Sequence, residues 1–104
     1  MAKGAKSYEE SLIESLKNPA EASAYLQAAL EDGEPQVFML ALKNVAIALG
    51  GVADLAKKTK LNRETLYRTL SKKGNPELKT LNSVLSALGL EITIAPKKVS
   101  KKAA

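Results

Sequence analysis

The chain has 104 residues, enough for one compact domain and too few for two independent ones. Its 16 lysine or arginine residues against 11 aspartate or glutamate residues give a formal net charge of +5, which favours an anionic partner. Because the chain contains no cysteine and no histidine, it lacks the usual zinc and iron ligands, a thiol nucleophile and an imidazole proton shuttle, which disfavours most hydrolase chemistry.

Without cysteine no disulfide can form, and the N-terminal residues MAKGAKSYEESL lack the apolar run of a secretory signal. The most apolar region, VFMLALKNVAIALGGVADLA, is interrupted by charged residues and glycines, which argues against a membrane-spanning helix. We therefore expect a soluble, cytoplasmic protein that does not bind a membrane. Nothing in the sequence predicts a cofactor or a metal.

The first part of the chain predicts three helices, each with a recognisable start. Ser7 is a candidate N-cap with Glu10 three residues later, which is the pattern of a capping box. Asn18 can cap a second helix, and Pro35 stands at the start of a third, central helix that two glycines end. The apolar residues at helical spacing are Tyr8, Leu12, Ile13 and Leu16, then Ala22, Tyr25, Leu26, Ala29 and Leu30, then Val37, Phe38, Ala41, Leu42, Val45, Ala46 and Leu49.

Two short amphipathic segments follow, VADLAKKT and NRETLYRTLSKK, joined across a tight turn with the sequence KTKL. Leu55 in the first and Leu66 in the second are expected to face the core, and together the segments indicate a helix-turn-helix over residues 51–71. A last helix is predicted within GNPELKTLNSVLSALG, with Gly89 as its C-terminal stop. The expected fold is therefore an all-α, repressor-like domain of five to six helices.

The segment LEITIAP changes from helical to alternating periodicity, because Leu90, Ile92 and Ile94 alternate with Glu91 and Thr93. This pattern predicts a short C-terminal β-strand, ended by a proline. A lone strand leaves its backbone groups unpaired, and no second strand is readable, so this one should pair with another chain. The homodimer that we expect uses Leu90, Ile92, Thr93 and Ile94 in antiparallel pairing with a second copy; pairing with a sheet edge of another protein is the alternative.

We expect one domain between two tails. The domain spans residues 8–95 and ends in the strand, residues 90–95. Residues 1–7 before it and residues 96–104 after it are basic and are expected to be flexible.

Charge is segregated within the domain. Residues 8–36 contain seven acidic residues and one basic residue, a net charge of −6, whereas residues 51–80 contain eight basic and three acidic residues, a net charge of +5. Any single charge is best explained as part of a solvated helix face. The segregation indicates two surfaces with different partners, because a phosphate backbone favours clustered lysine and arginine through counterion release.

The second helix of the helix-turn-helix presents a polar face. Stepping about 100° per residue from Asn62 places Leu66 and Leu70 on one side and polar residues on the other. In such motifs, the N-terminal residues of the second helix reach base edges in the major groove, where arginine pairs with guanine, glutamate accepts from cytosine and the threonine methyl contacts thymine. The candidate base-reading residues are Arg63, Glu64, Thr65 and Arg68.

Other residues are better placed for the DNA backbone. Asn62 would cap the helix, and the free amides at the start of the first helix of the motif could hold a phosphate. The candidates are Val52, Lys60, Asn62, Tyr67, Lys72 and Lys73. The alternative for Glu64 and Arg68 is a surface ion pair worth about 0.2–0.5 kcal/mol, and Arg63 and Tyr67 could be ordinary surface residues.

The stretch LAKKTKLNRETLYRTLSKKGNPELKTLNSVLSALGLEI resembles the C-terminal part of addiction-module antidote proteins, a HigA-like group within the repressor-type (Xre) helix-turn-helix superfamily. The elements RETLYRTLS, GNP and LSALGL carry the resemblance. Further upstream, AYLQAALEDGEPQVFMLALKNVAIALGG is similar to the N-terminal helices of that family, so the resemblance covers nearly everything between Tyr8 and Ile94.

The resemblance implies a DNA-binding antitoxin that autoregulates a type II toxin–antitoxin operon and neutralises a RelE/ParE-like toxin. Such toxins tend to be basic, so Glu9, Glu10 and Glu14 are candidate toxin contacts. A two-fold dimer would present two recognition helices to an inverted-repeat operator in double-stranded DNA. The family normally has glycine in the turn where this chain has Lys60, and a left-handed conformation there would cost about 1 kcal/mol.

Three alternatives remain beside the repressor and antitoxin. A phage-type regulator without a toxin partner would share every DNA-binding feature, and a protein-interaction module could retain the motif without binding DNA. An enzyme is the remotest, because the helical spacing of Glu9, Glu10 and Glu14 indicates exposed carboxylates rather than a catalytic site. We therefore expect no catalytic activity.

Overall fold

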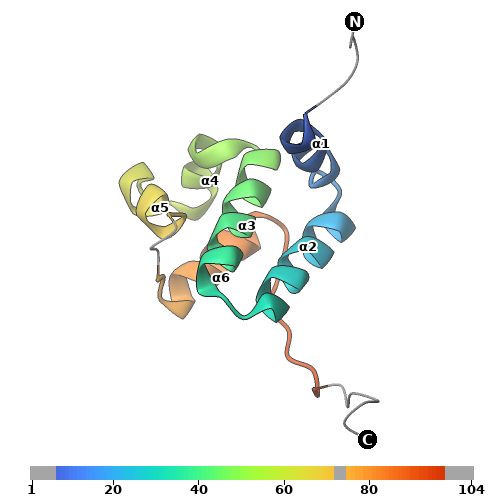
Figure 1. Cartoon of the computed structure of the whole chain (residues 1–104). Helices are drawn as coiled ribbons and strands as arrows, with labels where there is room; N and C mark the ends of the chain where they lie inside the picture. The colour runs from blue at the N-terminus through green and yellow to red at the C-terminus, as the bar shows by residue number, and fades with distance from the viewer. Residues whose placement is uncertain (1–6, 72–74, 98–104) are drawn as a thin grey trace, which may run out of the picture.

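The computed structural model describes residues 7–71 and 75–97, which form six α-helices. The all-α class is therefore confirmed. In chain order (Figure 1), the helices are α1 (Tyr8–Ser15), α2 (Pro19–Asp32), α3 (Pro35–Ala48), α4 (Gly51–Thr59), α5 (Arg63–Thr69) and α6 (Leu78–Ala87).

The helices begin where the sequence provides caps. Ser7 and Glu10 form a capping box: the Ser7 hydroxyl accepts from the Glu10 amide and the Glu10 carboxylate accepts from the Ser7 amide, both at 3.0 Å. The Asn18 side-chain oxygen accepts from the amide of Ala20 at 2.8 Å. Each cap satisfies amides that the first turn of a helix leaves free, which fixes the start of α1 and α2.

The core is built around α3, which crosses the middle of the domain in Figure 1 between α1 and α2 on one side and α4 and α5 on the other. Leu42 and Val45 of α3 are completely buried, and Leu55 of α4 and Leu66 of α5 are 2% and 0% exposed. The predicted inward faces are therefore confirmed at these positions. Burial of apolar side chains holds α4 and α5 against the rest of the domain, and α1 adds the partly buried Leu12 and Ile13.

The chain turns sharply between α3 and α4, whose axes are bent by 93° at the glycine pair. Gly50 adopts φ 123°, a left-handed backbone region that favours glycine, so the predicted break has a direct backbone cause. No single described helix is long and apolar enough to cross a membrane, and only α3 and α4 taken together reach the required length and hydropathy.

The prediction of a β-strand over residues 90–95 is wrong for the single chain. α6 ends at Ala87, and Gly89 follows with φ 80°, as the predicted stop requires. The residues after it form an irregular segment that leaves the domain beside α2 (Figure 1). A strand requires a hydrogen-bonded neighbour, and the described part of the chain supplies none. Most of both predicted tails, residues 1–6 and 98–104, lies outside the described residues.

Candidate nucleic-acid interface

The turn between α4 and α5 is held by one threonine and one left-handed lysine. The Thr59 hydroxyl donates to the carbonyl of Leu55 at 2.8 Å, and its oxygen accepts from the amide of Leu61 at 3.2 Å. Lys60 has φ 65° and ψ 15°, which is a left-handed conformation. This is the turn position at which the resembled family normally has glycine. α4 and α5 are therefore joined by a tight turn whose left-handed residue is a lysine rather than a glycine.

α5 is fixed by a cap at its start and by buried side chains on one face. The Asn62 side-chain oxygen accepts from the Thr65 amide at 2.7 Å, which confirms Asn62 as the cap. Leu66, Thr69 and Leu70 are 0%, 7% and 4% exposed. The rotation of α5 about its own axis is thereby set by packing.

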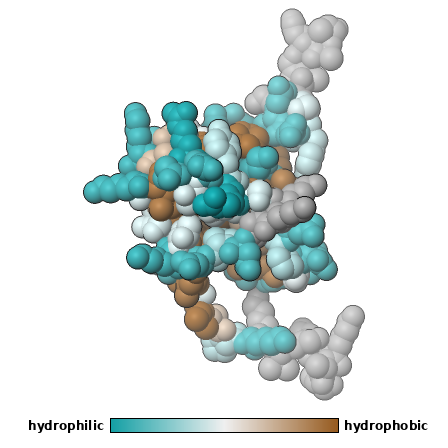
Figure 2. All heavy atoms as spheres, turned by 90° about the vertical axis from the view of Figure 1, so that its left-hand side faces the viewer, coloured by the Kyte–Doolittle hydropathy of each residue, from teal (hydrophilic) through white to brown (hydrophobic). Residues whose placement is uncertain are grey.

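This rotation presents the candidate base-reading residues to solvent. Arg63, Glu64 and Arg68 are exposed, and Tyr67 beside them is 62% exposed, whereas Thr65 is only partly exposed. α5 lies at the outer edge of the domain in Figure 1, and Figure 2, which views that side, shows long hydrophilic side chains over much of it. The structure therefore leaves three of the four predicted base-reading residues accessible on α5.

The alternative role for Glu64 and Arg68, an ion pair with each other, is not seen among the described residues. The two ion pairs found there are Asp54–Lys58 at 3.0 Å and Glu14–Lys17 at 3.3 Å, both on exposed helix faces. Glu64 and Arg68 can therefore both reach an external partner without first breaking a mutual contact.

The candidate backbone contacts are dispersed. Lys60 and Asn62 are exposed in the turn, and Val52 lies in the first turn of α4, which has no side-chain cap. The acidic residue Asp54 lies in the same first turn and pairs with Lys58. Lys72 and Lys73 lie outside the described residues.

The candidate toxin contacts lie together on the exposed face of α1, where Glu9, Glu10 and Glu14 surround Ile13 in a shallow hollow. Two of these carboxylates already have local partners, because Glu10 closes the capping box and Glu14 pairs with Lys17. No group of three or more acidic side chains in the described part of the chain is arranged to hold a metal ion.

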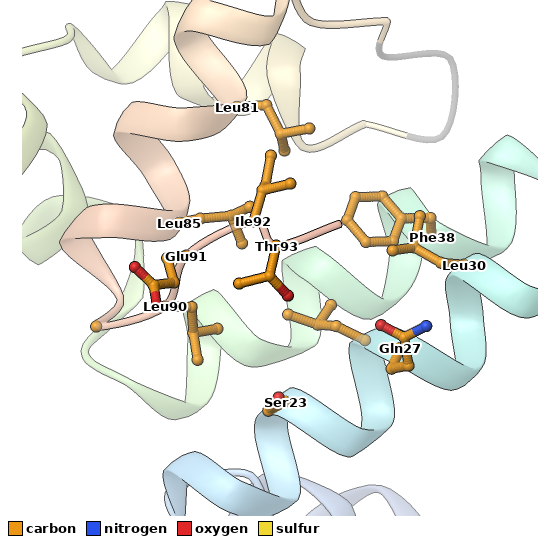
Figure 3. Close-up of a pocket in the computed structure, with 12 residues that line it drawn as sticks. Ser23, Gln27, Leu30, Phe38, Leu81, Leu85, Leu90, Glu91, Ile92 and Thr93 are labelled. Atoms are coloured by element: carbon orange, nitrogen blue, oxygen red, sulfur yellow. The ribbon is translucent and has the colours of Figure 1, made fainter. Parts of the chain in front are cut away.

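Sequence reasoning missed a cleft of about 490 Å³ between α2, α6 and the segment that follows α6. Figure 3 shows Leu81 and Leu85 of α6 on one side, Phe38 of α3 and Gln27 of α2 on the other, and Ile92 between them. These residues come together only through the tertiary arrangement. Periodicity alone could show that each is apolar or polar but not that they line one cleft.

Comparison with known proteins adds family evidence to this geometry. A family model described as "Probable addiction module antidote protein" matches residues 7–96. A protein of Haemophilus influenzae described as uncharacterized is 31% identical over 83 residues, which cover 80% of this chain and 84% of that protein. No solved structure matches the chain.

Proposed function

We propose that this chain, which belongs to the family of probable addiction module antidote proteins, is a sequence-specific DNA-binding antitoxin that represses its own operon. We assign it to the HigA-like group of the Xre helix-turn-helix superfamily. Membership of the family supports the antitoxin role and, in general terms, a toxin partner. Proteins of this kind are generally not enzymes, in keeping with the expectation from composition.

The observation that carries the DNA-binding proposal is the outward face of α5. Glu64 and Arg68 are exposed there with Arg63 at its flank, while Leu66 on the face opposite Glu64 and Arg68 is completely buried. Placed in a major groove, arginine can donate two hydrogen bonds to guanine and glutamate can accept from cytosine. Lys60 and Tyr67 at the border of this face are positioned for phosphates.

The operator that we propose is an inverted repeat bound by a homodimer. One short recognition helix reads only a few base pairs. Two copies related by a two-fold axis bind DNA more tightly and recognise a palindromic site. The two recognition helices would enter successive major grooves, about 34 Å apart.

The partner that we propose for the antitoxin role is a basic toxin similar to RelE or ParE. The exposed acidic face of α1, with Glu9 unpaired among the described residues, supports an electrostatic contribution to that contact. This surface is separate in Figure 1 from α5, so one molecule could hold DNA and toxin together.

Binding of labelled promoter DNA to purified variants tests the proposal. Arg63→Ala and Arg68→Ala should each lose about 1–3 kcal/mol on the native promoter and relax base preference, because each removes a base contact. Lys43→Ala is a matched control, since Lys43 is an exposed cation on α3 away from the motif. Its affinity and salt dependence should equal those of the parent protein.

Native affinity in both arginine variants would reject the docking of α5. Absence of salt-dependent promoter binding in the parent protein would instead favour the interaction module that no longer binds DNA. A chain that represses its promoter but has no adjacent toxin gene would be the phage-type regulator.

A further inference from the structure

The segment after α6 has a free backbone with defined ends. The Leu90 amide donates to the carbonyl of Leu85 at 2.8 Å, so Leu90 belongs to the cap of α6 rather than to a strand. Pro96 has no amide hydrogen to donate. Between them, the backbone groups of residues 91–95 have no hydrogen-bond partner among the described residues. This free stretch is symmetric about Thr93.

The side chains of this stretch are unequally covered. Ile92 borders the cleft and is 44% exposed, whereas Ile94 is 96% exposed. Figure 3 shows Ile92 reaching toward Leu81 while Thr93 points the opposite way, toward α2. Successive side chains therefore alternate, as they do in a backbone suited to pairing with another extended chain.

We propose that residues 91–95 pair antiparallel with the same residues of a second copy. The two-fold axis passes between the two Thr93 residues, which lie opposite each other. In this register, Ile92 lies opposite the partner's Ile94, and both face the apolar cleft. The pairing supplies the missing backbone hydrogen bonds and buries the most exposed isoleucine of the domain against Leu81 and Leu85. The cleft is thus completed by the second molecule.

Charge favours a second copy as the occupant. Glu91 begins the segment and Lys97 follows it by two residues; the two are an even number of residues apart, so an extended backbone directs both side chains to one face. Antiparallel pairing about Thr93 places Glu91 opposite the partner's Ala95 and diagonal to the partner's Lys97, within reach of long side chains. A two-fold axis at Glu91 would instead bring two glutamates face to face.

The inference deepens the proposed function, because it names the surface that joins the two copies of the DNA-binding dimer. It can be tested without DNA, so failure of the dimer and failure of DNA binding are separate results. The contact is small, so dimerisation should depend on protein concentration in the range that light scattering covers.

Cysteine cross-linking tests the register, because the chain contains no cysteine of its own. Under mild oxidation, Thr93→Cys should form a disulfide-linked dimer, since the two residues at this position face each other across the axis. Glu91→Cys should remain monomeric on a denaturing gel, because the cysteine of one chain would lie about four residues along the paired strands from the cysteine of the other. Equal cross-linking of both variants, or of neither, would overturn the register.

Light scattering tests the surface itself. Ile94→Asp should raise the dimer dissociation constant by at least about tenfold, because a carboxylate would enter the apolar cleft. Ile47→Asp on α3 is the control, since Ile47 is 47% exposed and lies outside the cleft. Arg63→Ala should also keep the parent dimer. An unchanged dimer in Ile94→Asp, or a parent protein that stays monomeric until toxin is added, would overturn the proposal.

Discussion

Asn62 lies between the turn and α5, where the two ends of its side-chain amide have different roles. The oxygen accepts from the Thr65 amide at 2.7 Å and thereby caps the helix. The nitrogen remains as a donor on the exposed side, where a DNA phosphate would lie. In the proposed DNA complex, helix stability and DNA affinity would therefore depend on different atoms of the same residue.

We expect Asn62→Asp to separate the two roles. Aspartate caps a helix about as well as asparagine, so the melting temperature should stay close to that of the parent. DNA affinity should fall by about tenfold, because the donor is replaced by a negative charge facing phosphate. Calorimetry and promoter binding measured on the same samples give both quantities.

Asn62→Ser is the matched control, because serine also caps helices and adds no charge. Its affinity should be intermediate between those of the parent and the aspartate variant. If Asn62→Asp bound the promoter like the parent, Asn62 would act only as a cap and would not contact the phosphate.

The turn between α4 and α5 shows how an element can keep its geometry at an energetic cost. Lys60 has φ 65°, a conformation in which Cβ crowds the backbone. The neighbouring Thr59 hydroxyl bridges the carbonyl of Leu55 and the amide of Leu61, and so holds the turn from within. Burial of Leu66 on the far side of the turn offsets the local strain.

We predict that Lys60→Gly stabilises the domain by about 1 kcal/mol, since glycine adopts φ near 65° without a Cβ penalty. For a domain of this size the melting temperature should rise by about 4–8 °C. Lys57→Gly is the control: it removes the same charge from the helical part of α4 and should destabilise by about 1 kcal/mol. A lower melting temperature for Lys60→Gly would show that the turn needs the lysine side chain.

The elements that the sequence predicts correctly are those with local causes. A capping side chain and the amide that it satisfies are two or three residues apart, as for Asn18 and Asn62, so helix starts can be read directly. Burial of Leu66 follows from helical periodicity. The exposure of Glu64 and Arg68 follows in turn, because each is two residues from Leu66 and so lies about 200° around the helix, on the opposite face.

The failures have non-local causes. Alternation at Ile92 and Ile94 predicts a strand, but a strand exists only with a neighbouring backbone, and the described part of the chain does not provide one. The same pattern includes Leu90, although the Leu90 amide donates to the carbonyl of Leu85 and so completes the end of α6. The cleft beside Phe38 forms where three separated segments meet, which no single-sequence pattern reports.

At the scale of the whole molecule, the acidic and basic regions of the sequence become separate surfaces. α1 and α5 lie on different sides of the domain in Figure 1, with α3 between them. Most of the acidic surplus is on α1 and α2, and Lys60, Arg63 and Arg68 are exposed around the turn and α5. A basic toxin and DNA would therefore approach the molecule from different directions.

We expect a double variant, Glu9→Lys with Glu14→Lys, to slow association with the toxin and to reduce the salt dependence of the rate, because it removes the attraction to a basic partner. Glu10 is left unchanged so that the capping box of α1 is kept. Stopped-flow association with the purified toxin measures the effect, and promoter affinity should not decrease. The same reversal at Glu31 and Asp32 is the control.

A smaller effect in that control would assign the contact to α1 rather than to the overall charge of the N-terminal helices. Association rates equal to those of the parent in the Glu9 and Glu14 variant would move the toxin surface away from α1. The cleft beside α6 would then become the next surface to test.

The exposed ring of Tyr67 has an optical consequence. The chain contains three tyrosines and no tryptophan, so its intrinsic fluorescence comes from tyrosine alone, without energy transfer to an indole. Tyr25 accepts a hydrogen bond from the Asn44 side chain at 2.9 Å inside the domain, and Tyr8 belongs to α1. Tyr67 is the tyrosine on α5. Quenching of tyrosine emission on adding promoter would thus be a label-free signal of recognition-helix docking, and Tyr67→Phe, which removes the tyrosine of α5, is the control.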